Sequence, residues 1–198
     1  MNEFSLYVLD IARNSVEAEA DSIAVTIDEN CERLTLTVTD NGRGMTEEQL
    51  RRADEPFYST RASHGRGMGI PLLKSLAEET GGTVRIDSVH ESSGGRHGTT
   101  LTASFNKSGG FIPLGNIAET VKTLVQGAPD TDFTFIHRFP YGEVSFSCGE
   151  VRKILGGVSL DHPEILRWIG DEIEAQYEDV RKAEAQICAD ADESARNK

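Results

Sequence analysis

The spacing of apolar residues changes from a helical period to an alternating one near the start of the chain. A helix is predicted over residues 3–20, where apolar side chains recur on one broad face. They are Leu6, Leu9, Ile11, Ala12, Val16 and Ala20. Strict alternation then predicts two strands, over residues 23–28 and 34–39, and the second strand leads directly into Asp40.

The pattern from residue 46 to residue 105 predicts two more helices and two more strands. Thr46 and Gln49 have the spacing of a capping box, so they mark the start of the first of these helices. Gly81 suits the C-terminal cap of the second helix. The predicted elements are helices over 47–53 and 68–80, strands over 83–89 and 99–105, and a polar loop over 54–66.

Residues 106–110 are polar and glycine-containing, and they suggest a boundary. We therefore expect a first domain over residues 1–107, a smaller α/β appendage over 111–180 and a polar, flexible tail over 181–198. The elements predicted in the appendage are helices over 115–126 and 149–155, a hairpin of strands 132–137 and 143–147, and a long helix with Asp161 as its N-cap. The pattern does not decide whether the appendage packs against the first domain.

Hairpins alternating with helices predict an α+β fold, in which a mixed, mostly antiparallel sheet carries its helices on one face. The chain has 198 residues, and its net charge of −13 argues against a nucleic-acid partner. Its three cysteines lie far apart, so the sequence predicts neither a zinc site nor a disulfide framework. There is no signal peptide and no apolar run of membrane-spanning length, so we expect a cytoplasmic protein that does not bind membranes.

Two glycine clusters provide the first candidate chemistry, Asp40-Asn-Gly-Arg-Gly-Met45 and Gly65-Arg-Gly-Met-Gly-Ile70. Glycine lets a ligand approach backbone N–H groups closely, and such groups bind phosphate. A carboxylate at Asp40 could accept a hydrogen bond from an exocyclic amine such as that of adenine. Taken alone, either cluster would more often be an ordinary turn than a ligand site, and no Walker-type lysine follows either of them.

A second candidate group lies on the first predicted helix. Asp10, Asn14 and Glu17 share one helical face. An amide oxygen can ligate Mg²⁺, and a carboxylate can deprotonate an attacking group beside a terminal phosphate. A solvated polar face is the alternative interpretation of this trio.

Five motifs occur in order over residues 4–105. They are Asp10-Ile-Ala-Arg-Asn14, Asp40-x-Gly42-x-Gly44, Glu55-Pro-Phe-Tyr-Ser-Thr-Arg61, the glycines at 65, 67 and 69, and Gly98-Thr99-Thr100. In this combination the chain resembles the histidine kinase-like ATPase superfamily, the Bergerat fold of gyrase B, the heat-shock chaperone, mismatch-repair ATPases, sensor kinases and anti-sigma kinases. The resemblance implies an ATP- and Mg²⁺-binding site within a Bergerat-type α/β sandwich.

The resemblance also implies a role for each matching residue. Asp10 would be the catalytic base, Asn14 would ligate Mg²⁺, and Asp40 would hold the adenine amine with support from Thr99. Gly42 and Gly44 would let the chain pass beneath the base, and Gly65, Gly67 and Gly69 would wrap the phosphates under a lid over 57–66. Met45 and Met68 are the remaining implied cofactor-binding residues. Arg61 and Lys74 are further phosphate candidates, for which a role as surface cations stays open.

The chain departs from the family pattern in two respects. The acidic residue is Asp10, one methylene shorter than the glutamate of the hydrolysing members. Nine residues precede Asp10, and no phosphoacceptor histidine lies ahead of it, so we do not expect autophosphorylation of the sensor-kinase type in this chain. The hypotheses left open are a Ser/Thr kinase acting on a partner protein, a nucleotide-gated regulator without turnover, and a slow ATPase that opens a homodimer.

Overall fold

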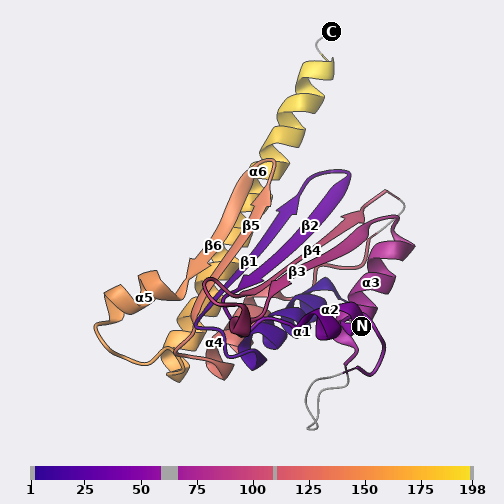
Figure 1. Ribbon diagram of the computed structural model, residues 1–198. Helices are drawn as coiled ribbons and strands as arrows, with labels where there is room; N and C mark the ends of the chain where they lie inside the picture. The colour runs from indigo at the N-terminus through magenta and orange to yellow at the C-terminus, as the bar shows by residue number, and fades with distance from the viewer. Residues whose placement is uncertain (1–2, 59–66, 109–110, 197–198) are drawn as a thin grey trace.

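Six strands form one open sheet in the order β3-β4-β2-β1-β5-β6 (Figure 1). The computed structural model describes residues 3–58, 67–108 and 111–196. The strands are β1 (Ser22–Glu29), β2 (Arg33–Asp40), β3 (Thr83–Val89), β4 (Gly98–Asn106), β5 (Asp132–Phe139) and β6 (Gly142–Ser147). Every neighbouring pair is antiparallel except β1 and β5, which are parallel. The predicted α+β class and the mostly antiparallel sheet are therefore confirmed.

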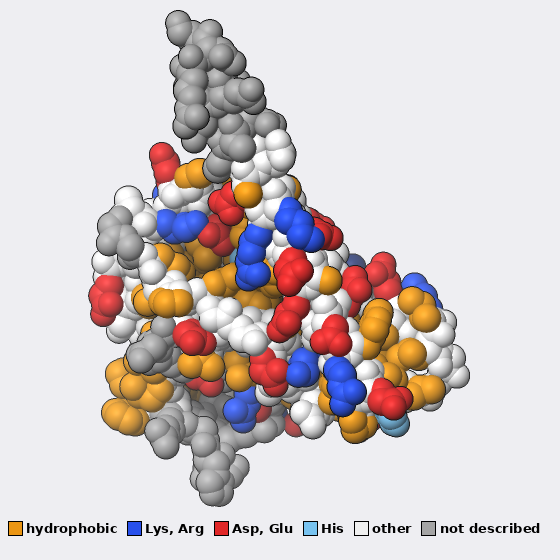
Figure 2. Space-filling model, turned by 180° about the vertical axis from the view of Figure 1, so that it is seen from behind, with side chains coloured by type: hydrophobic (Ala, Val, Ile, Leu, Met, Phe, Trp, Pro, Cys, Tyr) orange, Lys and Arg blue, Asp and Glu red, His pale blue; other side chains and the backbone are white. Residues whose placement is uncertain are grey.

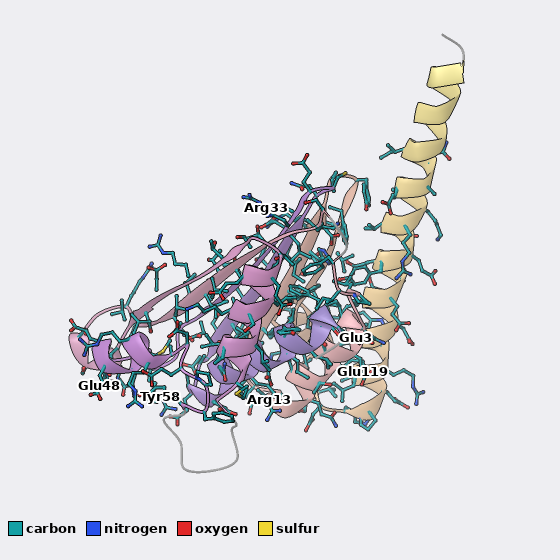
Figure 3. All side chains as sticks on the ribbon, turned by 90° about the vertical axis from the view of Figure 1, so that its right-hand side faces the viewer. Glu3, Arg13, Arg33, Glu48, Tyr58 and Glu119 are labelled. Carbon is teal, nitrogen blue, oxygen red and sulfur yellow. The ribbon has the colours of Figure 1, made fainter. Side chains whose placement is uncertain are left out.

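The helices that cover the sheet lie on one of its faces, as Figure 3 shows with the sheet nearly edge-on. The helices are α1 (Phe4–Glu17), α2 (Glu47–Arg52), α3 (Gly69–Glu79), α4 (Ile117–Gly127), α5 (Cys148–Leu155) and α6 (Pro163–Arg196). Contacts with the sheet come mainly from α1, α3 and α6, whereas α4 packs between α1 and α6.

Alternation in the strands accounts for this one-sided arrangement. In β1 and β2 every second residue is apolar and almost fully buried, while the residues between them are mostly threonine or charged. The buried set is Ile23, Val25, Ile27, Leu34, Leu36 and Val38. Because side chains alternate between the two faces of a strand, only one face can bury apolar surface against the helices. Full burial of each such side chain contributes about 1.5–3 kcal/mol.

The predicted N-cap residue is confirmed for α2, whereas for α6 it differs by one residue. Thr46 Oγ1 accepts the backbone N–H of Gln49 at 3.3 Å, and Gln49 Oε1 accepts that of Thr46 at 2.8 Å, which is the predicted capping box. The long helix instead begins at Pro163, so His162 and not Asp161 occupies the N-cap position. The backbone N–H of Glu164 donates to His162 Nδ1 at 3.4 Å.

The C-terminal region extends the same sheet. In the sheet, β5 lies beside β1, with Ser22 in register with Asp132, and β6 lies beside β5. The helix α6 packs against α4 and β6. Residues 111–180 thus pack against the first region, which the sequence pattern had left open. The helix α6 continues to Arg196, past the end of the sheet in Figure 1, so the segment from 181 that we expected to be a flexible tail continues this helix.

Charges are mixed on the face seen in Figure 2, where acidic and basic side chains are interspersed without a continuous basic area. Among the described residues, no helix combines the length and the hydrophobicity that crossing a bilayer requires.

Candidate nucleotide site

A cavity of about 720 Å³ lies between α1, the end of β2 and the start of α3. Its volume is in the range of pockets that hold cofactors. The predicted residues that line it are Asp10, Asn14, Asp40, Gly44, Met45, Gly67, Met68, Gly69 and Thr99. Gly42 does not line the cavity, and Arg61 and Gly65, with most of the expected lid, fall outside the described residues. The fold therefore brings together positions from all five motifs, with Tyr58 from the third of them.

Asp40 is the last residue of β2, and both of its carboxylate oxygens are held by donors of the protein. Oδ2 accepts the hydroxyl of Ser15 at 2.7 Å. Oδ1 accepts the backbone N–H of Gly42 at 2.9 Å and that of Thr99 at 3.2 Å. Each carboxylate oxygen has room for about two hydrogen bonds, so Oδ2 keeps acceptor capacity on the cavity side. A fixed acceptor of this kind suits an exocyclic amine.

The glycines after Asp40 are required by close backbone approaches. A Cβ atom at Gly42 would lie 2.7 Å from the carbonyl oxygen of Ala18, at the C-terminal end of α1. Gly44 has a φ of 66°, and a Cβ atom there would lie 2.0 Å from the carbonyl oxygen of Val89. Any side chain would push the loop after Asp40 away from α1 and β3. Gly44 and Met45 of this loop line the cavity, and we call them its floor.

Ser88 connects two parts of the cavity wall, and none of the five motifs contains it. The backbone N–H of Met45 donates to Ser88 Oγ at 2.8 Å, and Ser88 Oγ lies 2.9 Å from Thr99 Oγ1. The available signal was a serine in the alternating strand β3, on the same face as Val84 and Ile86. A polar residue on a core-facing position indicates a local hydrogen-bonding role.

Asp10 and Asn14 lie one helical turn apart on the α1 wall of the cavity. Burial raises the pKa of the Asp10 carboxyl above its ordinary value; Arg13 opposes this shift, and Glu17 adds to it. A Cβ atom at Gly69 would lie 3.3 Å from Asp10 Oδ2, so the carboxylate faces the first residue of α3. A partly buried carboxyl with a raised pKa is suited to accept a proton.

The oxygen donors of this wall fit Mg²⁺, which binds through one or two protein oxygens together with phosphate and water. Asn14 is exposed to the cavity and offers an amide oxygen, and Asp10 offers a carboxylate. No group of three or more His, Cys, Asp or Glu residues in the described part of the chain could hold a metal ion by itself.

A further part of the cavity lining comes from α2 and the residues that follow it. Tyr58 lines the cavity, and the guanidinium of Arg52 lies 4.1 Å from the centroid of the Tyr58 ring. Arg13 and Tyr58, from the two walls, are both labelled in Figure 3. Lys74, a phosphate candidate from the sequence, does not line the cavity, and its ammonium lies 2.6 Å from Asp54 Oδ2.

A sheet with helices on one face, a carboxylate at the end of β2 and glycine-dependent loops around the cavity together define a Bergerat-type nucleotide-binding domain. The family model described as histidine kinase-, DNA gyrase B-, and HSP90-like ATPase matches residues 3–109, more than half of the 198 residues. The chain belongs to this family, which supports ATP binding.

Individual relatives match the same region. The heme sensor protein HssS of Staphylococcus saprophyticus is 36% identical over 86 residues, which is 43% of this chain and 18% of that protein. Sporulation kinase B of Bacillus subtilis is 32% identical over 98 residues, 48% of this chain and 22% of the kinase. The chain thus spans about a fifth of the length of these relatives. The solved N-terminal domain of a DNA repair protein has the same fold, with a TM-score of 0.51 and 15% identity over 74% of this chain and 52% of that one.

Proposed function

We propose that this protein binds Mg²⁺-ATP in the cavity and transfers the γ-phosphoryl group to a Ser or Thr hydroxyl of a partner protein. The observation that carries the proposal is the placement of Asp10 and Asn14 on one cavity wall, with the fixed acceptor Asp40 in the same cavity. This arrangement gives a recognition group for the base and a proton acceptor near Asn14, the expected position of the phosphates.

In the proposed reaction, Asp40 accepts a hydrogen bond from the adenine amine, and the loop at Gly42 and Gly44 supports the base. Asp10 takes the proton of the acceptor hydroxyl while the hydroxyl oxygen forms a bond to the γ-phosphorus. The bond between the γ-phosphorus and the oxygen that bridges it to the β-phosphate breaks, and ADP is released. Asn14 would hold Mg²⁺, which when bound screens the charge of the phosphates.

A nucleotide-gated regulator without turnover is the second candidate. It is favoured by Asp10 itself, because an aspartate reaches less far from α1 than a glutamate would, and proton transfer is sensitive to displacements of about 1 Å. In that case ATP would order the cavity walls and change a protein interface without being consumed.

The test is calorimetric titration of ATP with and without Mg²⁺, followed by analysis of ADP, phosphate and labelled Ser/Thr peptides in the same samples. Tighter binding with Mg²⁺ and labelled peptide are expected for the kinase. Binding with intact ATP and no labelled peptide would favour the regulator. Asp40→Ala should abolish binding, while Asp87→Ala, on the exposed face of β3, is the matched control. No binding by the unmodified protein would overturn both candidates.

A further inference from the structure

The connection between β3 and β4 is bonded to the loop that follows Asp40. The backbone N–H of Glu91 donates to the carbonyl oxygen of Arg43 at 2.8 Å. The imidazole of His97 donates from Nδ1 to the carbonyl oxygen of Gly42 at 2.7 Å. The floor of the cavity is thus held from outside by residues that do not line it.

His97 supplies the side chain in this connection that reaches the loop. The peptide groups of Gly42 are consequently fixed on both sides, since its N–H donates to Asp40 Oδ1 at 2.9 Å and its carbonyl accepts from His97. The next residue, Gly98, crosses Asp40 so closely that a Cβ atom there would lie 2.0 Å from the carbonyl oxygen of Asp40. This crossing sets the position of the His97 backbone relative to the loop.

A second histidine in the same connection makes no such contact. His90 Nδ1 lies 2.8 Å from Ser92 Oγ and accepts the backbone N–H of Ser92 at 3.2 Å. These bonds cap the short turn at Glu91–Ser93 and end there. His90 and His97 therefore provide a matched pair, of which one acts only within the connection.

We propose that His97 is a positioning residue for base recognition: by holding the Gly42 carbonyl, it fixes the loop beneath the adenine and, through the Gly42 N–H, the orientation of Asp40. The inference rests on the proposed nucleotide site and adds a residue that belongs to none of the motifs. Its effect should appear in the affinity for the base and not in the chemistry at the phosphates.

Substitutions that differ only in where they place a donor test this role. The amide nitrogen of asparagine takes nearly the position of Nδ1, whereas that of glutamine takes the position of Nε2. Titrations of ATP and GTP are compared for the unmodified protein and the variants His97→Ala, His97→Asn, His97→Gln and His90→Ala, with thermal unfolding to check that each folds.

Loss of one such hydrogen bond should weaken ATP binding about threefold to tenfold in His97→Ala and His97→Gln. His97→Asn should restore most of it, and His90→Ala should leave it unchanged. The ratio of ATP affinity to GTP affinity should fall in His97→Ala and His97→Gln. Loss of a purely structural residue would leave this ratio unchanged. Equal ATP affinity and an equal ATP-to-GTP ratio in all variants would overturn the inference alone, whereas an unmodified protein that binds no ATP would overturn it together with the proposed function.

Discussion

The hydroxyl of Ser15 donates to Oδ2 of Asp40 over 2.7 Å, and this bond joins the helix that carries Asn14 to the strand end that carries the carboxylate proposed to recognise the base. Ser15 is nearly fully buried, with 3% of its surface exposed. In the proposed complex, the base and the phosphates of the nucleotide would therefore be contacted by elements that share a direct hydrogen bond.

Removal of this bond in Ser15→Ala should weaken ATP binding about tenfold to 100-fold, because a hydrogen bond to a charged group contributes about 1.5–3 kcal/mol. Asp40 would keep its two backbone donors but lose the group that orients Oδ2. Calorimetric titration measures the change. Ser5→Ala is the control, since Ser5 is equally buried on the same helix outside the cavity. Similar affinities in the two variants would contradict the role given to Ser15.

The substitution Asp10→Asn should lower phosphoryl transfer about 100-fold or more while changing the ATP affinity less than about threefold, because the amide cannot accept the hydroxyl proton. Burial raises the pKa of Asp10. As the pH decreases, transfer by the unmodified protein should therefore begin to fall at a higher pH than it would with an aspartate of ordinary pKa. Product analysis over a pH series measures both effects. Full transfer by Asp10→Asn would exclude Asp10 as the base.

Tyr177 on α6 should contribute to stability and not to nucleotide binding. Its hydroxyl lies 2.9 Å from His137 Nδ1, and His137, which has no exposed surface, bonds through Nε2 to Glu29 Oε2 at 2.9 Å. Tyr177→Phe leaves a buried polar nitrogen without its partner and should cost about 1–3 kcal/mol in urea unfolding. ATP affinity should be unchanged, and a parallel loss of affinity would show that α6 acts on the cavity.

Glu29 should make the stability of the protein pH-dependent. Burial alone would raise the pKa of Glu29, but hydrogen bonds from His137 and Lys107 outweigh burial and lower it. A carboxylate whose pKa is lower in the folded state stabilises the protein above the ordinary value of about 4.3, and this contribution is lost as the pH falls through the lower folded value.

The free energy of unfolding should consequently decrease on acidification below about pH 4.3, and less so in Glu29→Gln. Urea unfolding at a series of pH values measures this difference. The two proteins should approach each other in stability as the pH falls. A constant difference across that range would show that Glu29 does not titrate differently on folding.

Much of the fold followed from local patterns. Alternation in residues 23–28 and 34–39 predicted β1 and β2, and the capping box at Thr46 predicted the start of α2, because both depend only on neighbouring residues. At α6 the same reasoning placed the N-cap one residue too early, since His162 and Asp161 can both accept a backbone N–H and the sequence does not rank them.

The sequence by itself determined which residues alternate into the core and, through the order of its motifs, the family and the candidates from Asp10 to Thr99. Only the tertiary structure decided that β5 lies parallel to β1, that Lys74 pairs with Asp54, and that His97 reaches Gly42. The physical reason is the range of the interactions: periodicity is set by neighbours along the chain, whereas strand partners and side-chain contacts depend on which distant segments meet when the core closes.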